Sequence, residues 1–136
     1  MERSKELIVK TPDSKVENKY TVEWPTIQQM IDIESMKLML SKGKYTDMIL
    51  TGTVWMSRAL NYIDLIAYFS VLSPSLLKDL KVDIRSIEVS DTHKGLLKVY
   101  QEQFLPWWND YEDMIRKLDE PEEEIKIEKD DKGSTD

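Results

Sequence analysis

The sequence predicts a mainly α-helical domain with an N-terminal β-hairpin and an acidic C-terminal tail. Residues 19–24 alternate polar and apolar side chains, as the residues of a half-buried strand do. Within residues 97–118 apolar residues recur at spacings of three and four, which indicates an amphipathic helix. Residues 119–136 carry nine acidic residues against three lysines, and this composition predicts disorder.

Length and composition are consistent with a single domain. A chain of 136 residues can bury roughly two thirds of its unfolded surface, so it needs no metal or disulfide to fold. We expect one globular domain over residues 1–118, with the hairpin in 1–25 and a bundle of about four helices in 26–118, followed by the acidic tail in 119–136. The absence of cysteine excludes disulfides, cysteine-ligated zinc and a thiol nucleophile.

The charge distribution argues against nucleic acid as a partner, and the hydropathy pattern argues against a membrane. Most of the net charge of −7 lies in the tail, so the body lacks the clustered Lys and Arg that bind phosphates. The sequence has no run of about 18 apolar residues, and residues 1–10 do not resemble a signal peptide. We therefore expect a cytoplasmic protein.

The hairpin is predicted from two apolar segments and the turn between them. Residues 6–10 form a short apolar run, and residues 11–14 contain the proline and aspartate that favour turns. In the second strand, Tyr20, Val22 and Trp24 share one face. An isolated hairpin is marginally stable, so this face should pack on the helices that follow.

The first two predicted helices are unusually apolar. The first, residues 27–41, is expected to cover more than one apolar stripe, so it lies centrally or exposes apolar surface to a partner. Thr26 and its capping-box pattern should begin this helix, and Gly43 should end it. The second, residues 47–72, is apolar nearly all round, and we expect a break or bend near Gly52.

The remaining helices are predicted around two prolines. Residues 74–81 form a short helix that begins at Pro74. The last helix, residues 92–118, contains Pro106, so we expect a kink in residues 103–106. Its apolar stripe consists of Leu97, Tyr100, Phe104, Trp107, Tyr111, Ile115 and Leu118.

The sequence contains no recognisable catalytic or ligand-binding pattern. His93 is the single histidine, and no second histidine or serine–carboxylate pair can be assembled around it. The four glycines form no phosphate-binding motif. Asp110 and Asp113 share a helix face, as solvated acids commonly do. We therefore expect a protein without enzymatic activity, cofactor or metal.

Aromatic and methionine side chains are the candidate partner-binding residues. Trp107 and Trp108 are adjacent on one helix and cannot point the same way, so we expect one of them near the surface. Trp108 is one step off the apolar stripe and is the candidate binding anchor. Met30, Met36 and Met39 lie on the first helix, and methionine adapts to several packing partners. For both groups the alternative is ordinary core packing.

The order of elements resembles a family of phage morphogenesis proteins. The segments that carry it are Tyr-Thr-Val-Glu-Trp-Pro-Thr at 20–26, Ile-Asp-Ile-Glu at 31–34 and Lys-Gly-Lys-Tyr at 42–45. With the apolar helices and charged tail that follow, residues 5–120 are most similar to the tail assembly chaperones of tailed bacteriophages. The resemblance implies a non-enzymatic protein of the host bacterial cytoplasm. Such a protein coats the apolar, helical tape-measure protein, keeps it soluble, helps to recruit tail-tube subunits and often oligomerises.

Three functions remain open on sequence alone. The first is a protein-binding chaperone that holds a partner with apolar helices and that could form a homo-oligomer. The second is a structural subunit of a phage particle or another large assembly. The third is a small enzyme with an unrecognised site. The acidic tail fits either a solubilising extension or an arm that steers a basic partner.

Overall fold

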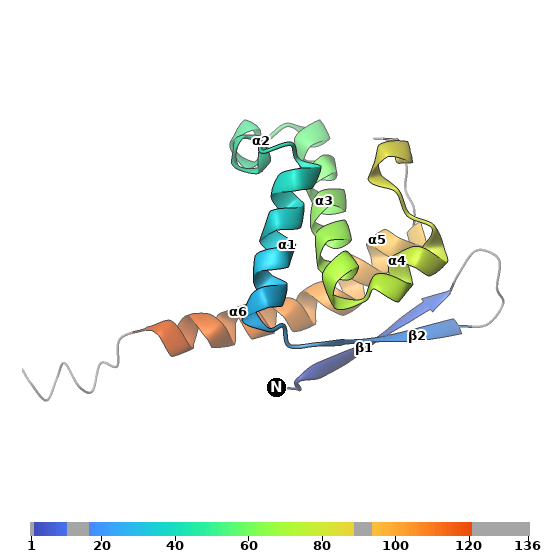
Figure 1. Ribbon diagram of the computed structural model, residues 1–136, viewed down its shortest axis with the longest axis vertical. Coiled ribbons are helices and arrows are strands. Elements are labelled where there is room, and N and C mark those ends of the chain that lie inside the picture. The colour runs from blue at the N-terminus through green and yellow to red at the C-terminus, as the bar shows by residue number, and fades with distance from the viewer. Residues whose placement is uncertain (1, 11–16, 89–93, 121–136) are drawn as a thin grey trace, which may run out of the picture.

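The computed structural model describes residues 2–10, 17–88 and 94–120. In this part of the chain a two-stranded hairpin lies beneath a layer of helices, which confirms the predicted fold class (Figure 1). The predicted turn in residues 11–14, His93 and the tail from residue 121 lie outside the described residues. The elements are β1 (Ser4–Lys10), β2 (Glu17–Glu23), α1 (Ile27–Leu40), α2 (Tyr45–Thr51), α3 (Val54–Leu72), α4 (Pro74–Leu80), the 3₁₀ turn η1 (Ile84–Ser86), α5 (Lys94–Lys98), the π-helical turn η2 (Val99–Phe104) and α6 (Leu105–Asp119).

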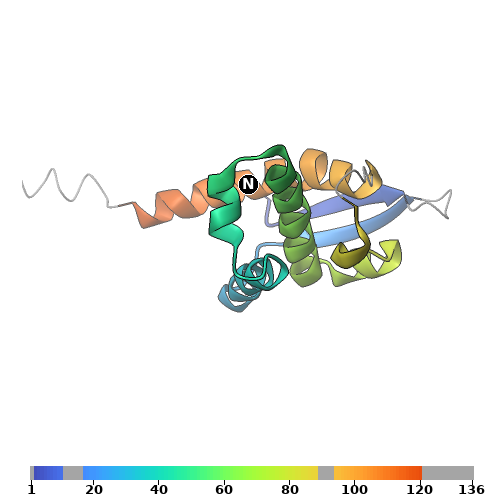
Figure 2. The same cartoon turned by 90° about the horizontal axis from the view of Figure 1, so that it is seen from above.

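The hairpin packs one face on the helices, as its alternating pattern predicts. The strands are antiparallel, with Leu7 opposite Tyr20. The side chains of Leu7, Val9, Tyr20 and Val22 are buried, while the residues between them point to the opposite, mostly exposed face. Seen from above, α5 and α6 lie on the β1 side of the hairpin, and α1 and α4 lie on the β2 side (Figure 2).

Helix α1 begins as the sequence predicts, but its end differs, because Lys42, with a φ of +55°, takes the first left-handed position that was expected for Gly43. Thr26 Oγ1 accepts a hydrogen bond from the Gln29 amide at 3.1 Å, and Gln29 Oε1 accepts one from the Thr26 amide at 2.9 Å. This reciprocal pair is a capping box. After the helix, Gly43 adopts a φ of +77°, the left-handed conformation that favours glycine.

The second predicted helix is divided at Gly52. Gly52 has a φ of +66° and ends α2, and Thr53 caps α3 by accepting a hydrogen bond from the Met56 amide. Glycine reaches this conformation without steric cost, so the chain turns here. The expected start of this helix was wrong, because α2 begins at Tyr45 and Lys44 occupies the N-cap position.

The last predicted helix is interrupted by a π-helical turn. The turn η2 ends at Phe104, and α6 begins at Leu105 with Pro106 in its first turn. Proline has no amide hydrogen to close a regular helical turn, so a wide turn directly before it accommodates the missing bond. The disruption expected in residues 103–106 therefore takes the form of a π turn. Farther on, α6 extends past the body and leaves Leu118 exposed (Figure 1).

Aromatic side chains from α3, η2 and α6 form the centre of the core. Neighbouring ring centroids among them lie 4.9–6.3 Å apart. These distances are typical of offset and edge-on aromatic packing. The buried residues of this cluster are Tyr68, Phe69, Tyr100, Phe104 and Trp108.

Candidate partner-binding surface

The structure places both Trp107 and Trp108 in the core, so the expected surface position for one of them was wrong. Trp107 Nε1 donates a hydrogen bond to the backbone oxygen of Glu2 at 3.0 Å. The Trp108 ring packs against Tyr68 of α3 at 4.9 Å between centroids, and only 1 % of Trp108 is exposed. The expectation assumed a single buried face. Instead, the two side chains pack on different elements, the N-terminal strand region and α3.

The methionines of α1 divide between the two sides of the helix. Met30 and Met36 are half-buried against the core, whereas Met39 is 63 % exposed. Three further apolar residues on the outer side of α1 are also exposed: Ile27, Ile31 and Leu38. Of the two alternatives for this helix, the structure thus shows the second, in which it exposes apolar surface.

A second group of exposed apolar side chains surrounds the break at Gly52. In α2, Ile49 is exposed and Leu50 is 78 % exposed. At the start of α3, Val54 is exposed and Trp55 is 61 % exposed. We call Ile49, Leu50, Val54 and Trp55 the apolar tip. It lies at the end of the helical layer that is farthest from the hairpin (Figure 1).

An apolar pocket of about 300 Å³ lies beside α2 and η1. Its charged rim is formed by Lys42, Arg58 and Glu88. A pocket of this size lies at the lower end of the range of ligand-binding pockets. Its apolar lining consists of Leu40, Met48, Ala59, Ile63, Ile84 and Ile87.

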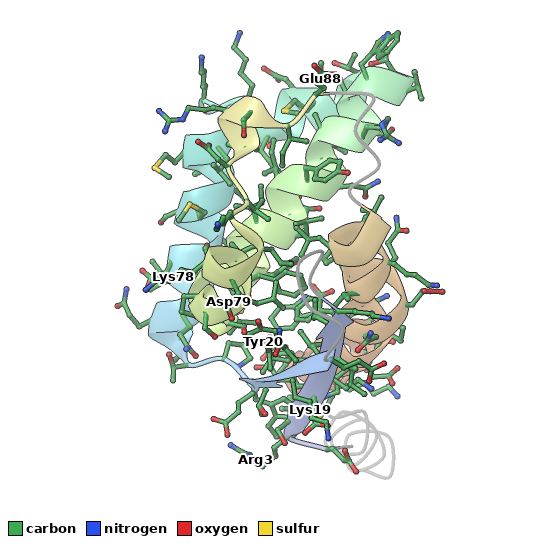
Figure 3. All side chains as sticks on the ribbon, turned by 90° about the vertical axis from the view of Figure 1, so that its right-hand side faces the viewer. Arg3, Lys19, Tyr20, Lys78, Asp79 and Glu88 are labelled. Atoms are coloured by element: carbon green, nitrogen blue, oxygen red, sulfur yellow. The ribbon has the colours of Figure 1, made fainter. Side chains whose placement is uncertain are left out.

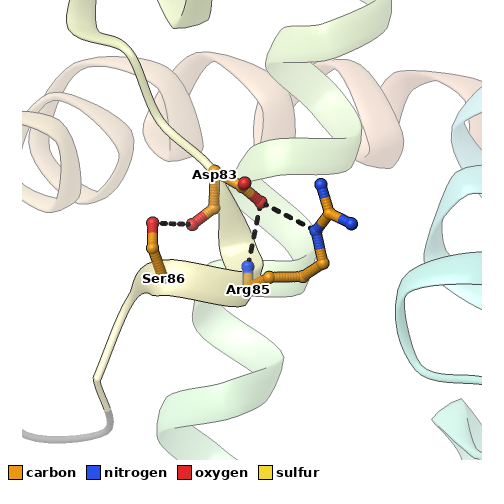
Figure 4. A network of polar contacts seen from close by, with 3 residues as sticks. All are labelled: Asp83, Arg85 and Ser86. Atoms are coloured by element: carbon orange, nitrogen blue, oxygen red, sulfur yellow. Dashed lines mark hydrogen bonds and ion pairs between the residues drawn. The ribbon is translucent and has the colours of Figure 1, made fainter.

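The turn η1 holds two isoleucines against this pocket. One carboxylate oxygen of Asp83 accepts hydrogen bonds from the backbone amide of Arg85 at 3.0 Å and from its Nε at 3.5 Å (Figure 4). The hydroxyl of Ser86 donates to the Asp83 backbone oxygen at 3.0 Å. The Arg85 amide, then its side chain, lower the pKa of the Asp83 carboxyl. This local capping fixes the turn that presents Ile84 and Ile87.

A polar network beneath α2 joins three helices. Lys37 of α1 is buried, and its Nζ donates to the Tyr68 hydroxyl of α3 at 3.1 Å. The Lys37 Nζ also lies 3.7 Å from a carboxylate oxygen of Glu34. Tyr45 of α2 donates from its hydroxyl to Asp64 Oδ1 of α3 at 2.5 Å. The Tyr45 bond therefore ties α2, which has no buried residue, to the body of the protein.

Burial and local contacts both shift the pKa values of this network. Desolvation raises the pKa of the Asp64 carboxyl, although the Tyr45 hydroxyl and the charge of Lys37 act in the opposite direction. Burial alone would lower the pKa of Lys37. Its contact with Tyr68 and the charges of Glu34 and Asp64 raise that pKa overall. Lys37 therefore remains charged, and its hydrogen bond to the Tyr68 hydroxyl links α1 to α3.

The network gives no sign of a catalytic role. Lys37, Asp64 and Tyr68 use their polar atoms on one another, and none of them lines the pocket beside α2. Acid–base catalysis requires such groups to reach a bound substrate. Asp110 is exposed and Asp113 pairs with Arg116 at 2.7 Å. Among residues 2–10, 17–88 and 94–120, no group of three His, Asp or Glu side chains could hold a metal ion.

The apolar tip was not singled out from the sequence, although a signal for it exists. The predicted second helix is apolar nearly all round, and Gly52 interrupts it between Leu50 and Val54. A short helix that ends at such a break has too few neighbours to cover both of its sides. An apolar segment on each side of a glycine break therefore indicates exposed apolar residues.

In the part of the chain that the structure describes, no single helix has the length and apolarity to cross a membrane. Helix α3 and residues Pro74–Ser86 reach that length and apolarity only when taken together, and the two are bent by 119°. Comparison with protein-family models, curated proteins and solved structures finds no match to this chain.

Proposed function

We propose that this protein binds another protein through the apolar tip and holds an apolar, helical client in solution. The observation that carries the proposal is the exposure of Leu50 and Trp55 on α2 and α3, the two helices that also contribute Met48 and Ala59 to the apolar pocket. Burying one such side chain in a complex contributes about 1.5–3 kcal/mol. Contiguous exposed apolar groups of this kind commonly mark protein-binding sites.

The backbone of the tip favours a helical client over an extended one. An extended partner needs hydrogen-bond partners for its own backbone. The tip is formed by helix ends, whose free backbone groups do not make the continuous row of amides and carbonyls that a strand edge offers to an extended partner. A helix satisfies its own backbone and can present a row of apolar side chains to the tip and to the pocket.

The resemblance to tail assembly chaperones supplies a specific client for this proposal. A tape-measure protein is long, apolar and helical, and it needs cover until the tail is assembled. The exposed tip would bind such helices, and the charged residues elsewhere on the surface would keep the complex in solution. In this proposal the protein acts by binding, without catalysis, in the cytoplasm of a bacterial host.

The test is the solubility of the client. The partner captured from the native host would be expressed alone, with the protein, and with the variant Leu50→Glu. We expect the client to be soluble only with the unchanged protein. A client equally soluble in all three cultures would contradict the proposal. Mass spectrometry of finished particles separates the alternatives, because a chaperone is absent from them and a structural subunit is present.

A further inference from the structure

Helix α6 keeps an apolar stripe beyond the point where the body of the protein ends. The start of the stripe is covered, since Trp107 and Trp108 are buried. It continues through Tyr111, which is partly buried, to Ile115 and Leu118, which are 37 % and 72 % exposed. In Figure 1 this half of α6 projects from the side of the molecule, so a second helix can reach its apolar face.

Charged residues border the stripe on both sides. Because each residue turns an α-helix by about 100°, Glu112 and Arg116 lie along one border, and Asp110 and Lys117 lie along the other. All four are exposed. Arg116 also bonds Asp113 of its own helix through Nη1 at 2.7 Å, and a guanidinium has donors for a second carboxylate. On each border the acid precedes the base, so a second α6 that runs in the reverse direction meets acids with bases.

We propose that two copies of this chain pair through α6, with the helices antiparallel and a two-fold axis beside Met114. In an antiparallel helix pair, each border faces the same border of the partner helix. Asp110 then lies opposite Lys117 of the second copy, and Glu112 lies opposite Arg116 of the second copy. Since the two-fold axis repeats each contact, four pairs of opposite charge flank the stripe.

The same register joins the apolar residues. Tyr111 lies opposite Leu118 of the second copy, and Ile115 lies opposite Met114 and Ile115 of the second copy. At a rise of about 1.5 Å per residue, the apolar and the charged pairs all lie within about 2–3 Å of a common level along the axis. The exposed half of the stripe is therefore covered by the same half of the partner helix.

Other arrangements of the two helices bring like charges together. A parallel pair would place Glu112 beside Asp110 of the second copy, and Arg116 beside Lys117 of the second copy. An antiparallel pair shifted by one helical turn would place either Glu112 or Arg116 opposite its own counterpart. Like charges across an interface are unfavourable. Charge complementarity thus selects one orientation and one register.

The hairpin suits a second copy less well, although the outer edge of β2 is open. Among the described residues, no backbone hydrogen bond from a helix or loop reaches Lys19, Thr21 or Glu23, so this edge can accept an extended strand. Tyr20 points up from β2 and donates to Asp79 of α4 at 2.6 Å, while Lys19 lies on the opposite face (Figure 3). Symmetric pairing of two β2 edges would place both helical layers on one face, where α1 and α4 of the two copies would occupy the same space (Figure 2).

Sedimentation velocity of the full chain over a range of concentrations tests the proposal. We expect a dimer with a micromolar dissociation constant, because the contact is short for a protein interface. An acidic variant carries Arg116→Glu and Lys117→Glu. A basic variant carries Asp110→Lys and Glu112→Lys. Each variant alone makes all four pairs repulsive, so its dissociation constant should rise about ten-fold or more. An equal mixture of the two restores opposite charges in every pair, and its heterodimer should form as tightly as the unchanged dimer.

Two further variants complete the test. Leu118→Glu places a charge within the stripe and should abolish the dimer. Lys44→Glu combined with Lys78→Glu changes the net charge as much as the acidic variant does, at exposed residues outside α6, and should leave the dimer intact. A chain that stays monomeric up to millimolar concentration would contradict the pairing. A mixture that dimerises no better than either charge variant alone would contradict the antiparallel register.

The pairing and the proposed function can fail separately. Helix α6 lies at the hairpin end of the helical layer, and the apolar tip lies at the other end (Figure 1). Variants in α6 should therefore change the dimer and leave binding of a client to the tip intact. Far-UV circular dichroism of each variant shows whether its helices remain folded.

Discussion

Trp55 and Trp108 carry the same side chain in opposite surroundings. Trp108 packs among the rings of Tyr68, Phe104 and Tyr111, whereas Trp55 at the start of α3 is mostly exposed. A fully buried indole contributes to folding, and an exposed one is available to a partner. Substitution should therefore affect stability at one position and binding at the other.

Trp108→Ala should destabilise the fold by about 3–5 kcal/mol, because it leaves a large cavity among the aromatic rings. Trp108→Phe should cost less. It retains ring packing, and it removes an indole N–H that has no hydrogen-bond partner among the described residues. The free energy of unfolding in urea measures both effects. A Trp108→Ala variant as stable as the unchanged protein would contradict the core assignment.

Asp64 should make the fold sensitive to pH in a defined direction. Its pKa is raised above the ordinary value of 3.8, so the folded chain keeps this proton to a higher pH than the unfolded chain does. Its contribution to stability is complete below 3.8 and is lost as the pH rises through the raised pKa. In the variant Asp64→Asn the asparagine does not titrate, and its side-chain carbonyl can still accept the hydrogen bond from the Tyr45 hydroxyl.

Relative to the unchanged protein, Asp64→Asn should therefore gain stability between pH 3 and pH 7. Urea unfolding of both proteins at each pH gives the difference in the free energy of unfolding. Tyr45→Phe, which removes the donor but keeps the ring, serves as the control for the lost hydrogen bond. A difference that stays constant, or falls as the pH rises, would show that burial does not raise the Asp64 pKa.

Helix α2 is the element whose conformation depends most on glycine. It lies between Gly43 and Gly52, both with positive φ, it has no buried residue, and the Tyr45 hydroxyl bonds it to Asp64. The tip residues Ile49 and Leu50 are carried by this helix. Their position therefore depends on the two glycine turns more than on core packing.

Gly52→Ala should destabilise the protein by about 1–2 kcal/mol, because alanine is strained in the left-handed conformation. No steric clash adds to this cost, since a Cβ at Gly52 would meet no atom within 4 Å. Gly95→Ala is the matched control. Gly95 lies in α5, where a Cβ would meet only the Lys10 oxygen at 3.9 Å, so this change should gain up to about 1 kcal/mol. Thermal unfolding that ranks the two variants in the opposite order would rule out the strain at Gly52.

For helices and turns, the sequence predicted the features that depend only on residues close together in the chain. The capping box at Thr26, the turn at Gly43 and the break at Gly52 depend on neighbouring residues, and the structure has each of them. The start of α2 at Tyr45 was not predictable, because its N-terminal residues are held by a distant partner, Asp64. Such long-range contacts leave no periodic trace in the sequence.

The molecule as a whole carries two kinds of available surface at opposite ends. The apolar tip offers side chains, and the edge of β2 offers backbone groups. The first suits a helix and the second suits a strand, so the two sites need not compete. We propose a client helix for the tip.

The binding surface was harder to predict than the fold. Hydrophobic patterns indicated which segments are helical, but not which apolar side chains the folded chain would cover. Of the three candidate methionines only Met39 is exposed. Trp107 and Trp108 are both buried, because two separate elements cover the adjacent faces of α6. Exposure is a property of the assembled layers and follows only from their arrangement.

Affinity capture from the native host with three baits tests the central claim most directly. The baits are the unchanged protein, Leu50→Glu in the apolar tip, and Leu118→Glu, a leucine of similar exposure on α6 at 72 %. We predict that one protein rich in apolar helices is retained by the unchanged bait and by Leu118→Glu but is lost from Leu50→Glu. Equal retention by all three baits would contradict the assignment of the tip as the binding surface.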